Sequence, residues 1–142
     1  YNSRLDEIQA SFLSTKLHDL DFINTRRNEI ADYYLKNINN DNLILPYNDH
    51  SDIIYNVWHQ FVVSSKIKDV FIDRLKDNGI ETLVHYPKSI NKYSCYNNMS
   101  GFQNKLESNI INHHDDIFSL PICPVMTDLQ VSYVVEVLND IQ

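Results

Sequence analysis

The chain has 142 residues, of which 43% are hydrophobic, 22% charged and 11% aromatic, a composition typical of one globular domain and unlike that of a disordered segment. Its formal net charge of -7 disfavours a nucleic-acid partner, because an acidic surface is repelled by the phosphate backbone. No apolar run approaches the roughly 20 residues of a membrane-spanning helix, and the polar N-terminus is not a signal peptide, so we expect no membrane partner and a cytoplasmic location.

The N-terminal part of the chain predicts a long helix over residues 4–38. Glycine and proline are absent from this stretch, and its apolar residues recur at helical spacing. A helix of this length exceeds the usual globular range, so we expect a bend near residues 19–21. Ser3, with Asp6 three residues later, resembles a capping box and predicts that the helix begins at about Arg4.

The rest of the chain alternates short strands with helices. Aromatic and β-branched residues predict strands at residues 43–46, 55–63, 80–86 and 117–121. Helical spacing and end signals predict helices at residues 69–78 with Gly79 as the cap, at 102–112, and from a capping box of Thr127 and Gln130 to residue 141. This order favours an α+β fold, in which a small, mainly antiparallel sheet carries helices on one face.

The first helical turn is a candidate anion site. A helix N-terminus has unpaired amide donors and a partial positive charge. The amide of Asn2 and the guanidinium of Arg4 add further donors there. The alternative is that Ser3 only caps the helix, while Asn2 and Arg4 are solvated.

A second candidate site lies at the end of the strand predicted over residues 80–86. His85 and Tyr86 end this strand, and two lysines follow in a loop without periodicity. These donors suit a diphosphate, and Tyr93 or Tyr96 offers a flat face for a base. Neighbouring residues of a regular strand point to opposite faces, so His85 and Tyr86 share a site only if the strand bends before the proline. The alternative is a solvated loop with a core histidine.

The remaining histidines and the cysteines predict no further chemistry. The runs at residues 48–52 and 113–116 contain metal-ligand residue types, but neighbouring side chains do not converge, so we expect polar turns and no metal site. His59 is predicted to be a hydrogen-bonded strand residue. Cys95 and Cys123 predict free or buried thiols, since two cysteines make no disulfide framework.

Five segments of the chain carry a resemblance to a known family. They are YNSRLDEIQASFLSTKL, RRNEIADYYLKNI, VWHQFVV, GIETLVHYP and FSLPICPVMTDLQVSYVVEVL. In this order they resemble the C-terminal part of the DegT family of pyridoxal-phosphate-dependent aminotransferases, which act on nucleotide-linked keto sugars. The motifs NSRLDE, VWH and VHYP are most similar to the members that make 3-amino-3,6-dideoxyhexoses on a thymidine diphosphate carrier.

The resemblance implies that residues 1–142 are the small C-terminal domain of an enzyme with the aspartate aminotransferase fold, known as fold type I. The large domain, with pyridoxal phosphate and the lysine that holds it, would then lie outside this chain. The resemblance therefore implies that the chain contains no catalytic residue and is inactive alone. The whole enzyme is expected to be a homodimer that transfers an amino group, with glutamate as donor, to a nucleotide-linked keto-deoxysugar for lipopolysaccharide (O-antigen) or other surface polysaccharide biosynthesis.

The resemblance also implies roles for four residues. Asn2 matches an asparagine that crosses the dimer interface and binds the cofactor phosphate of the other subunit. Arg4 matches an arginine that orients substrate near the partner's active-site mouth. His85 and Tyr86 match a His-Tyr pair that contacts the nucleotide-sugar at its diphosphate. Two other classes of function remain alternatives: a non-catalytic interaction or dimerisation domain, and the sensory domain of a regulator.

Overall fold

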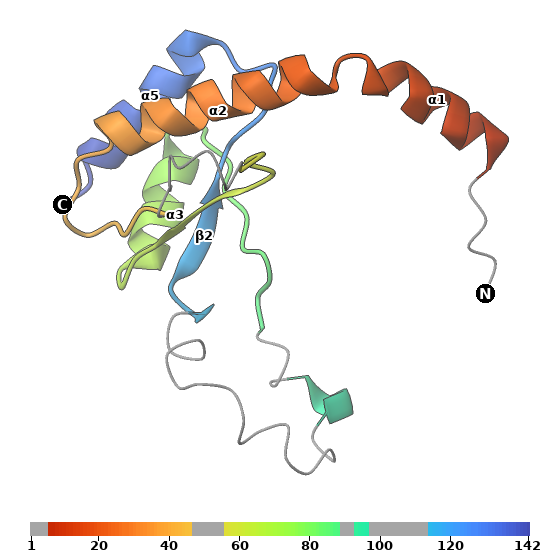
Figure 1. Ribbon diagram of the computed structural model, residues 1–142. Helices are drawn as coiled ribbons and strands as arrows, with labels where there is room; N and C mark the ends of the chain where they lie inside the picture. The colour runs from red at the N-terminus through yellow and green to blue at the C-terminus, as the bar shows by residue number, and fades with distance from the viewer. Residues whose placement is uncertain (1–5, 47–55, 89–92, 97–113) are drawn as a thin grey trace.

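The computed structural model of the chain describes residues 6–46, 56–88, 93–96 and 114–142. Its elements are, in chain order, α1 (Glu7–Leu17), α2 (Leu20–Asn37), β1 (Phe61–Ser64), α3 (Lys68–Asp77), the 3-10 helix η2 (Ser94–Tyr96), β2 (Ile117–Leu120) and α5 (Asp128–Asn139). Figure 1 shows α2 and α5 side by side over the sheet, whereas α1 extends away from it. None of the described helices is both long and apolar enough to cross a membrane. The helix predicted over residues 102–112 lies outside the described residues.

The helix predicted over residues 4–38 is two helices, α1 and α2, with a short break between them, which confirms the expected bend. The predicted start at Arg4 is wrong, because α1 begins only after Asp6. The Asp6 carboxylate accepts a hydrogen bond from the amide of Ile8 at 3.2 Å. A side-chain acceptor at this position pairs an amide that the helix leaves free, and so marks the first turn. Ser3, the other half of the predicted capping box, lies outside the described residues.

The sheet has two antiparallel strands, β1 and β2, which confirms the predicted antiparallel pairing. Phe61 lies opposite Leu120, and Val63 lies opposite Phe118. The strand predicted over residues 55–63 begins later than expected. Trp58 has a φ of 47°, which is outside the extended region of backbone conformation and interrupts a strand.

Two further predicted strands, at residues 43–46 and 80–86, are only single bridges at the two sides of the sheet. Ile44 pairs with Ser64 of β1, and Leu83 pairs with Ser119 of β2. On the Ile44 side the ladder cannot continue through the next hydrogen-bonding residue, two positions on, because that residue is a proline and has no N–H to donate. Both predicted segments therefore join the sheet, but each is too short there to be a strand.

Local helix-end signals are confirmed at α3 and α5. Gly79 follows α3 with a φ of 72°, the left-handed conformation that glycine adopts without steric cost. At α5 the Thr127 side chain accepts from the amide of Gln130, and the Gln130 side chain accepts from the amide of Thr127. The end of α3 and the start of α5 are therefore each determined by residues that lie within a few positions in the sequence.

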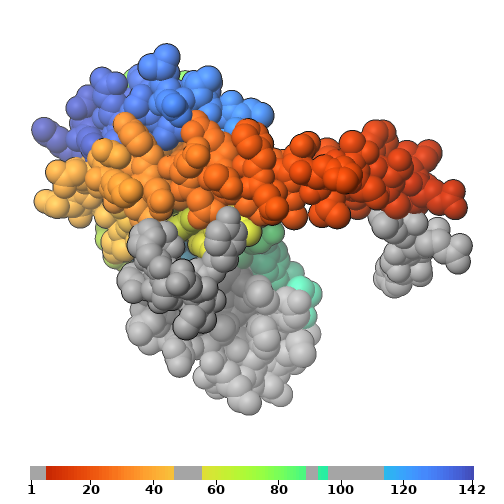
Figure 2. All heavy atoms as spheres, turned by 45° about the horizontal axis from the view of Figure 1, so that its top comes forward, coloured from red at the N-terminus to blue at the C-terminus, as the bar shows by residue number. Residues whose placement is uncertain are grey.

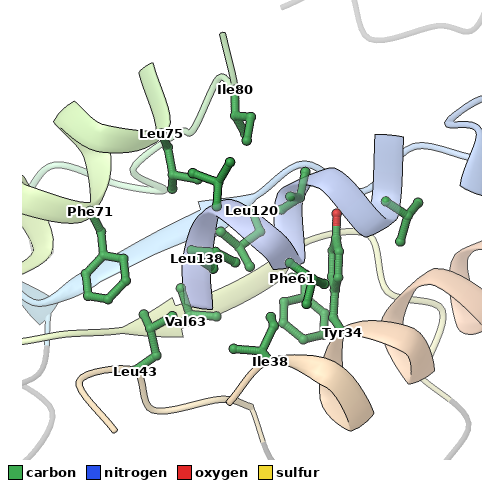
Figure 3. Close-up of a cluster of buried hydrophobic side chains, with 14 of the residues drawn as sticks. Tyr34, Ile38, Leu43, Phe61, Val63, Phe71, Leu75, Ile80, Leu120 and Leu138 are labelled. Carbon is green, nitrogen blue, oxygen red and sulfur yellow. The ribbon is translucent and has the colours of Figure 1, made fainter. Parts of the chain in front are cut away.

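The hydrophobic core lies between the inner face of the sheet and the helices α2, α3 and α5 (Figure 3). Tyr34 of α2 packs edge-on against Phe61, with ring centroids 5.1 Å apart, and its hydroxyl donates to the carbonyl of Pro121 at 2.8 Å. Burial raises the pKa of Tyr34 well above its usual range. Leu75 of α3 and Leu138 of α5 are likewise fully enclosed. The core therefore joins every described element except α1 and η2.

Helix α1 stands outside this core. None of its residues is buried, and four large apolar side chains expose between 57% and 67% of their surface: Ile8, Phe12, Leu13 and Leu17. Figure 2 shows α1 as a red rod that projects from the rest of the molecule. We call these four residues the α1 apolar face.

Candidate functional site

A hollow of about 270 Å³ lies beside β2. Its polar lining comes from three separate parts of the chain: His59 and Gln60 before β1, Glu81 and His85 after α3, and Ser119 within β2. The remaining lining residues are apolar and include Leu83 and the chain that follows β2. We call this cavity the His85 hollow, because His85 is the predicted site residue that it contains.

The strand register places Ser119 on the side of the sheet away from the core. Side chains alternate between the two faces of a strand. Phe118 and Leu120 belong to the core, so Ser119 between them points to the opposite face. It is nevertheless only 6% exposed, because the segment around His85 covers it.

His85 is held against Ser119 by a backbone bridge and a side-chain contact. Leu83 and Ser119 exchange two backbone hydrogen bonds, of 2.7 Å from the Ser119 amide and 3.3 Å from the Leu83 amide. Two residues further along, the Nδ1 atom of His85 lies 3.0 Å from the Ser119 hydroxyl. The His85 ring is therefore part-buried and fixed at one nitrogen.

Tyr86 lies next to His85 but makes a different kind of surface. The two rings meet edge to face, with centroids 6.1 Å apart and an angle of 84° between their planes. They therefore lie side by side, whereas neighbouring side chains of a regular strand point to opposite faces. The peptide bond between them is cis. Tyr86 is 69% exposed and is not among the residues that line the His85 hollow. It presents its ring to solvent beside the hollow.

Arg27 of α2 supports the walls of the hollow from the core side. One guanidinium nitrogen donates to the carbonyls of Trp58 at 3.0 Å, His59 at 3.3 Å and Ile122 at 3.2 Å. These carbonyls belong to the segments that enter β1 and leave β2. Arg27 therefore joins two walls of the hollow that are far apart in the sequence.

Arg26, next to it, ties α2 to the start of α5. Its guanidinium contacts Asp128 at 2.6 Å, the carbonyl of Met126 at 2.8 Å and Glu29 at 3.0 Å. Hydrogen bonds to Asp128 and then to Glu29 raise the pKa of Arg26. The arginine therefore stays charged, and it fixes the loop between β2 and α5.

The other residues predicted at the two sites either lie outside the described residues or are not among those that line the hollow. Asn2 and Arg4 lie outside the described residues. In the loop after His85, Lys88 is exposed, and the Tyr93 side chain is 41% exposed. Of the predicted site residues that the structure describes, His85 therefore lines the hollow and Tyr86 lies beside it.

His59 differs from its predicted place in a strand, and no role was predicted for Gln60 or Ser119. His59 precedes β1 instead of lying within a strand, and its side chain is exposed at the hollow. Ser119 appears in an otherwise apolar strand, IFSL, and this single polar residue was the only available signal. Its contact with His85 joins residues 34 positions apart, which local spacing does not predict.

Residues 114–116 form the described part of the polar turn that was predicted over residues 113–116. Asp116 pairs with Lys66, and the carbonyl of Asp115 accepts a hydrogen bond from Lys68. Within the described ranges, no three histidine, cysteine or acidic side chains come together as a metal-binding group. Both Cys95 and Cys123 are free and exposed, so of the two predicted states the free thiol is the one observed.

Comparison with known proteins places the chain in a family. A family model for DegT/DnrJ/EryC1/StrS aminotransferases matches residues 1–139. The chain is 43% identical, over 97% of its length, to a dTDP-3-amino-3,6-dideoxy-alpha-D-galactopyranose transaminase of Aneurinibacillus thermoaerophilus. It is 32% identical, over 96% of its length, to a pleiotropic regulatory protein of Geobacillus stearothermophilus. In each case it spans 37% of the relative's length.

A solved structure has a fold closely similar to that of this chain. The crystal structure of S. venezuelae DesV in complex with a ketimine intermediate matches 96% of this chain with a TM-score of 0.84 and 29% identity, and the match covers 36% of DesV. The predicted α+β fold, as a part of an aminotransferase of fold type I, is thereby confirmed. Since the family model matches nearly its whole length, the chain belongs to the DegT/DnrJ/EryC1/StrS aminotransferase family.

Proposed function

We propose that this chain is the small C-terminal domain of a pyridoxal-phosphate-dependent aminotransferase that transfers an amino group from glutamate to a nucleotide-linked keto-deoxysugar. The observation that carries the proposal is the 43% identity, over 97% of the chain, to a transaminase named for a dTDP-linked amino sugar. In this proposal the enzyme is a cytoplasmic homodimer, and its product serves lipopolysaccharide or other surface polysaccharide biosynthesis.

The His85 hollow is the proposed contact with the nucleotide-sugar. His85 and Gln60 line it and have N–H groups to offer the oxygens of a diphosphate. Glu81 also lines it, and its carboxylate suits a sugar hydroxyl, because it accepts hydrogen bonds and repels phosphate. The exposed ring of Tyr86 adds a phenol beside the hollow. This chain then binds and orients the substrate.

The hollow does not fit the covalent holding of pyridoxal phosphate. That role needs a lysine amine, and the described residues that line the hollow include no lysine. We therefore assign the cofactor to a large domain outside this chain. Asn2 is proposed to bind the cofactor phosphate, and Arg4 to orient substrate, in the partner subunit, as the resemblance implies.

The α1 apolar face is the proposed contact with the rest of the enzyme. Ile8, Phe12, Leu13 and Leu17 are more than half exposed, and a group of exposed large apolar side chains is typical of a protein interface. The chain spans only 37% of the relatives' length, so an enzyme of their size has further polypeptide to cover this face.

The proposal is tested with the enzyme made from the complete reading frame that contains this chain. With pyridoxal phosphate, glutamate and a dTDP-linked keto sugar, the expected product is the amino sugar. His85→Ala is expected to raise KM for the nucleotide-sugar about tenfold and to change kcat little, because His85 binds without taking part in the chemistry. Lys76→Ala, at an exposed residue in the last turn of α3 that does not line the hollow, is the control. Failure to aminate nucleotide-linked keto sugars of any kind contradicts the proposal.

A non-catalytic interaction or dimerisation domain is the second candidate function, and the α1 apolar face is the observation that favours it. The two candidates are distinguished by titrating the chain alone with thymidine diphosphate, because incubation with pyridoxal phosphate and reduction with borohydride do not separate them. In both cases no lysine is expected to carry a reduced adduct. The aminotransferase reading further expects thymidine diphosphate to shift the His85 and Tyr86 resonances, whereas the alternative expects no shift and tight binding of a protein partner.

A further inference from the structure

The contact between Ser119 and His85 constrains where the histidine carries its proton. The Ser119 hydroxyl lies 3.0 Å from Nδ1 of His85, and Ser119 is only 6% exposed. A neutral histidine has one ring nitrogen that donates and one that accepts, whereas a serine hydroxyl does either. The direction of this hydrogen bond therefore fixes the tautomer of the neutral ring.

The surroundings of Ser119 decide that direction. The backbone amide and carbonyl of Ser119 are occupied by the bridge to Leu83. Among the described residues, Nδ1 of His85 is the only acceptor that its hydroxyl reaches. If Nδ1 donated instead, the hydroxyl proton of this 6% exposed residue would have no acceptor among the described residues, which is unfavourable. The hydroxyl therefore donates, and Nδ1 accepts.

This assignment leaves the other nitrogen of His85 as a donor. When Nδ1 accepts, the proton of the neutral ring is on Nε2, and Nε2 has no hydrogen-bond partner among the described residues. The ring lines the His85 hollow. An N–H in that position suits an acceptor on a ligand, such as a phosphate oxygen or a sugar oxygen.

We infer that Ser119 is a positioning residue that sets the Nε2–H tautomer of His85, so that this N–H meets an anionic oxygen of the nucleotide-sugar. The inference rests on the proposed function for the identity of the ligand, but its tautomer part stands on the geometry of this chain alone. Ser119 also lines the hollow, but its proposed role is exerted through His85. The backbone bridge to Leu83 holds both residues at the required separation, whichever side chain occupies position 119.

The tautomer part is tested by nitrogen-15 NMR of the imidazole ring, at a pH where the ring is neutral. Wild type is expected to show a protonated Nε2 and an unprotonated, hydrogen-bonded Nδ1 at His85. Ser119→Ala removes the donor, so the ring is expected to become a mixture of both tautomers, while Ser119→Thr restores the hydroxyl and the single tautomer. Ser64→Ala, on the neighbouring strand and away from the hollow, is the control and is expected to leave the ring unchanged.

The ligand part is tested by titration with thymidine diphosphate, using the same variants of the enzyme from the complete reading frame. Ser119→Ala is expected to weaken binding about three- to tenfold, the effect of one hydrogen bond, and Ser119→Thr to recover it. A wild-type ring protonated at Nδ1, or an unchanged tautomer in Ser119→Ala, overturns the inference. A tautomer change without any thymidine diphosphate binding in the wild type supports the role of Ser119 toward His85 and contradicts the proposed function.

Discussion

Helices α1 and α2 follow each other in the chain and both carry many apolar residues, yet they differ in what they bury. The second half of α2 places Ile30, Ala31 and Tyr34 in the core, whereas α1 buries nothing. The difference does not begin at the break between them, because Phe22 near the start of α2 is also 73% exposed. Burial begins where α5 and the sheet come alongside α2. The apolar residues of a helix therefore show that it has surface to bury, but they do not show which part of the protein buries that surface.

The comparison predicts first that aromatic residues of the two regions differ strongly in their contribution to stability. Phe61 is fully buried and contacts Tyr34 and Trp58, so Phe61→Ala is expected to lower the free energy of unfolding of the chain by about 3–5 kcal/mol. Phe12→Ala, on the α1 apolar face, is expected to change it by less than about 0.5 kcal/mol. Urea denaturation measures both. If Phe61→Ala does not fold, the smaller change Phe61→Leu serves instead. Equal losses at the two positions contradict an uncovered α1.

The second prediction concerns the pH dependence of the free energy of unfolding, to which Tyr34 on the core side of α2 contributes. Burial raises the pKa of Tyr34 above the value of a tyrosine in the unfolded chain, about 10. The unfolded chain therefore loses this proton at a lower pH than the folded chain. The free energy of unfolding is then unaffected by Tyr34 below about pH 10 and falls above it, by up to about 1.4 kcal/mol per pH unit.

Tyr34→Phe separates this contribution from that of the other tyrosines. The variant loses the hydrogen bond to Pro121 and is expected to be about 1 kcal/mol less stable than wild type at pH 9. At pH 11 the difference is expected to close or reverse, because the variant has no proton to lose at this position. Tyr33→Phe, at the exposed neighbour, should follow the wild-type curve. A constant difference between Tyr34→Phe and wild type across this pH range would show that the Tyr34 hydroxyl is not shielded from solvent.

The third prediction, which has the smallest expected effect, compares the N-terminal caps of α5 and α1. Thr127→Ala removes a full capping box from α5, a helix that packs on the core, and is expected to cost about 1 kcal/mol of unfolding free energy. Asp6→Ala removes the cap of α1 and is expected to change global stability by less than about 0.3 kcal/mol while lowering the helical circular dichroism, because α1 frays without unfolding the core. A global loss in Asp6→Ala as large as that in Thr127→Ala would mean that α1 unfolds together with the core.

The elements that the sequence predicted best depend on neighbouring residues. Gly79 ends α3 with a φ of 72°, and Thr127 with Gln130 begins α5, as their residue types indicate. The strands were predicted less well because pairing is set by distant residues. Ile44 and Leu83 each make one bridge, and apart from the proline two positions after Ile44 the nearby sequence does not report how far the ladder extends.

The candidate site divides in the same way. The motif VHYP was sufficient to select His85 and Tyr86, and the resemblance supplied a role for both. Ser119 was not selected, because its importance comes from the antiparallel register that places it across from Leu83 and under His85. The three carbonyls that Arg27 joins were missed for the same reason. A site built from one strand, one loop and one helix is visible only once their relative positions are known.

Hydrogen exchange of the α1 amides most directly tests the claim that this chain is one part of a larger aminotransferase. It is measured on the chain alone and on the protein from the complete reading frame, with the α5 amides as the internal reference. We expect rapid exchange of α1 and slow exchange of α5 in the chain alone, and slow exchange of both in the longer protein, where the α1 apolar face is covered. Equally rapid exchange of α1 in both proteins would contradict it.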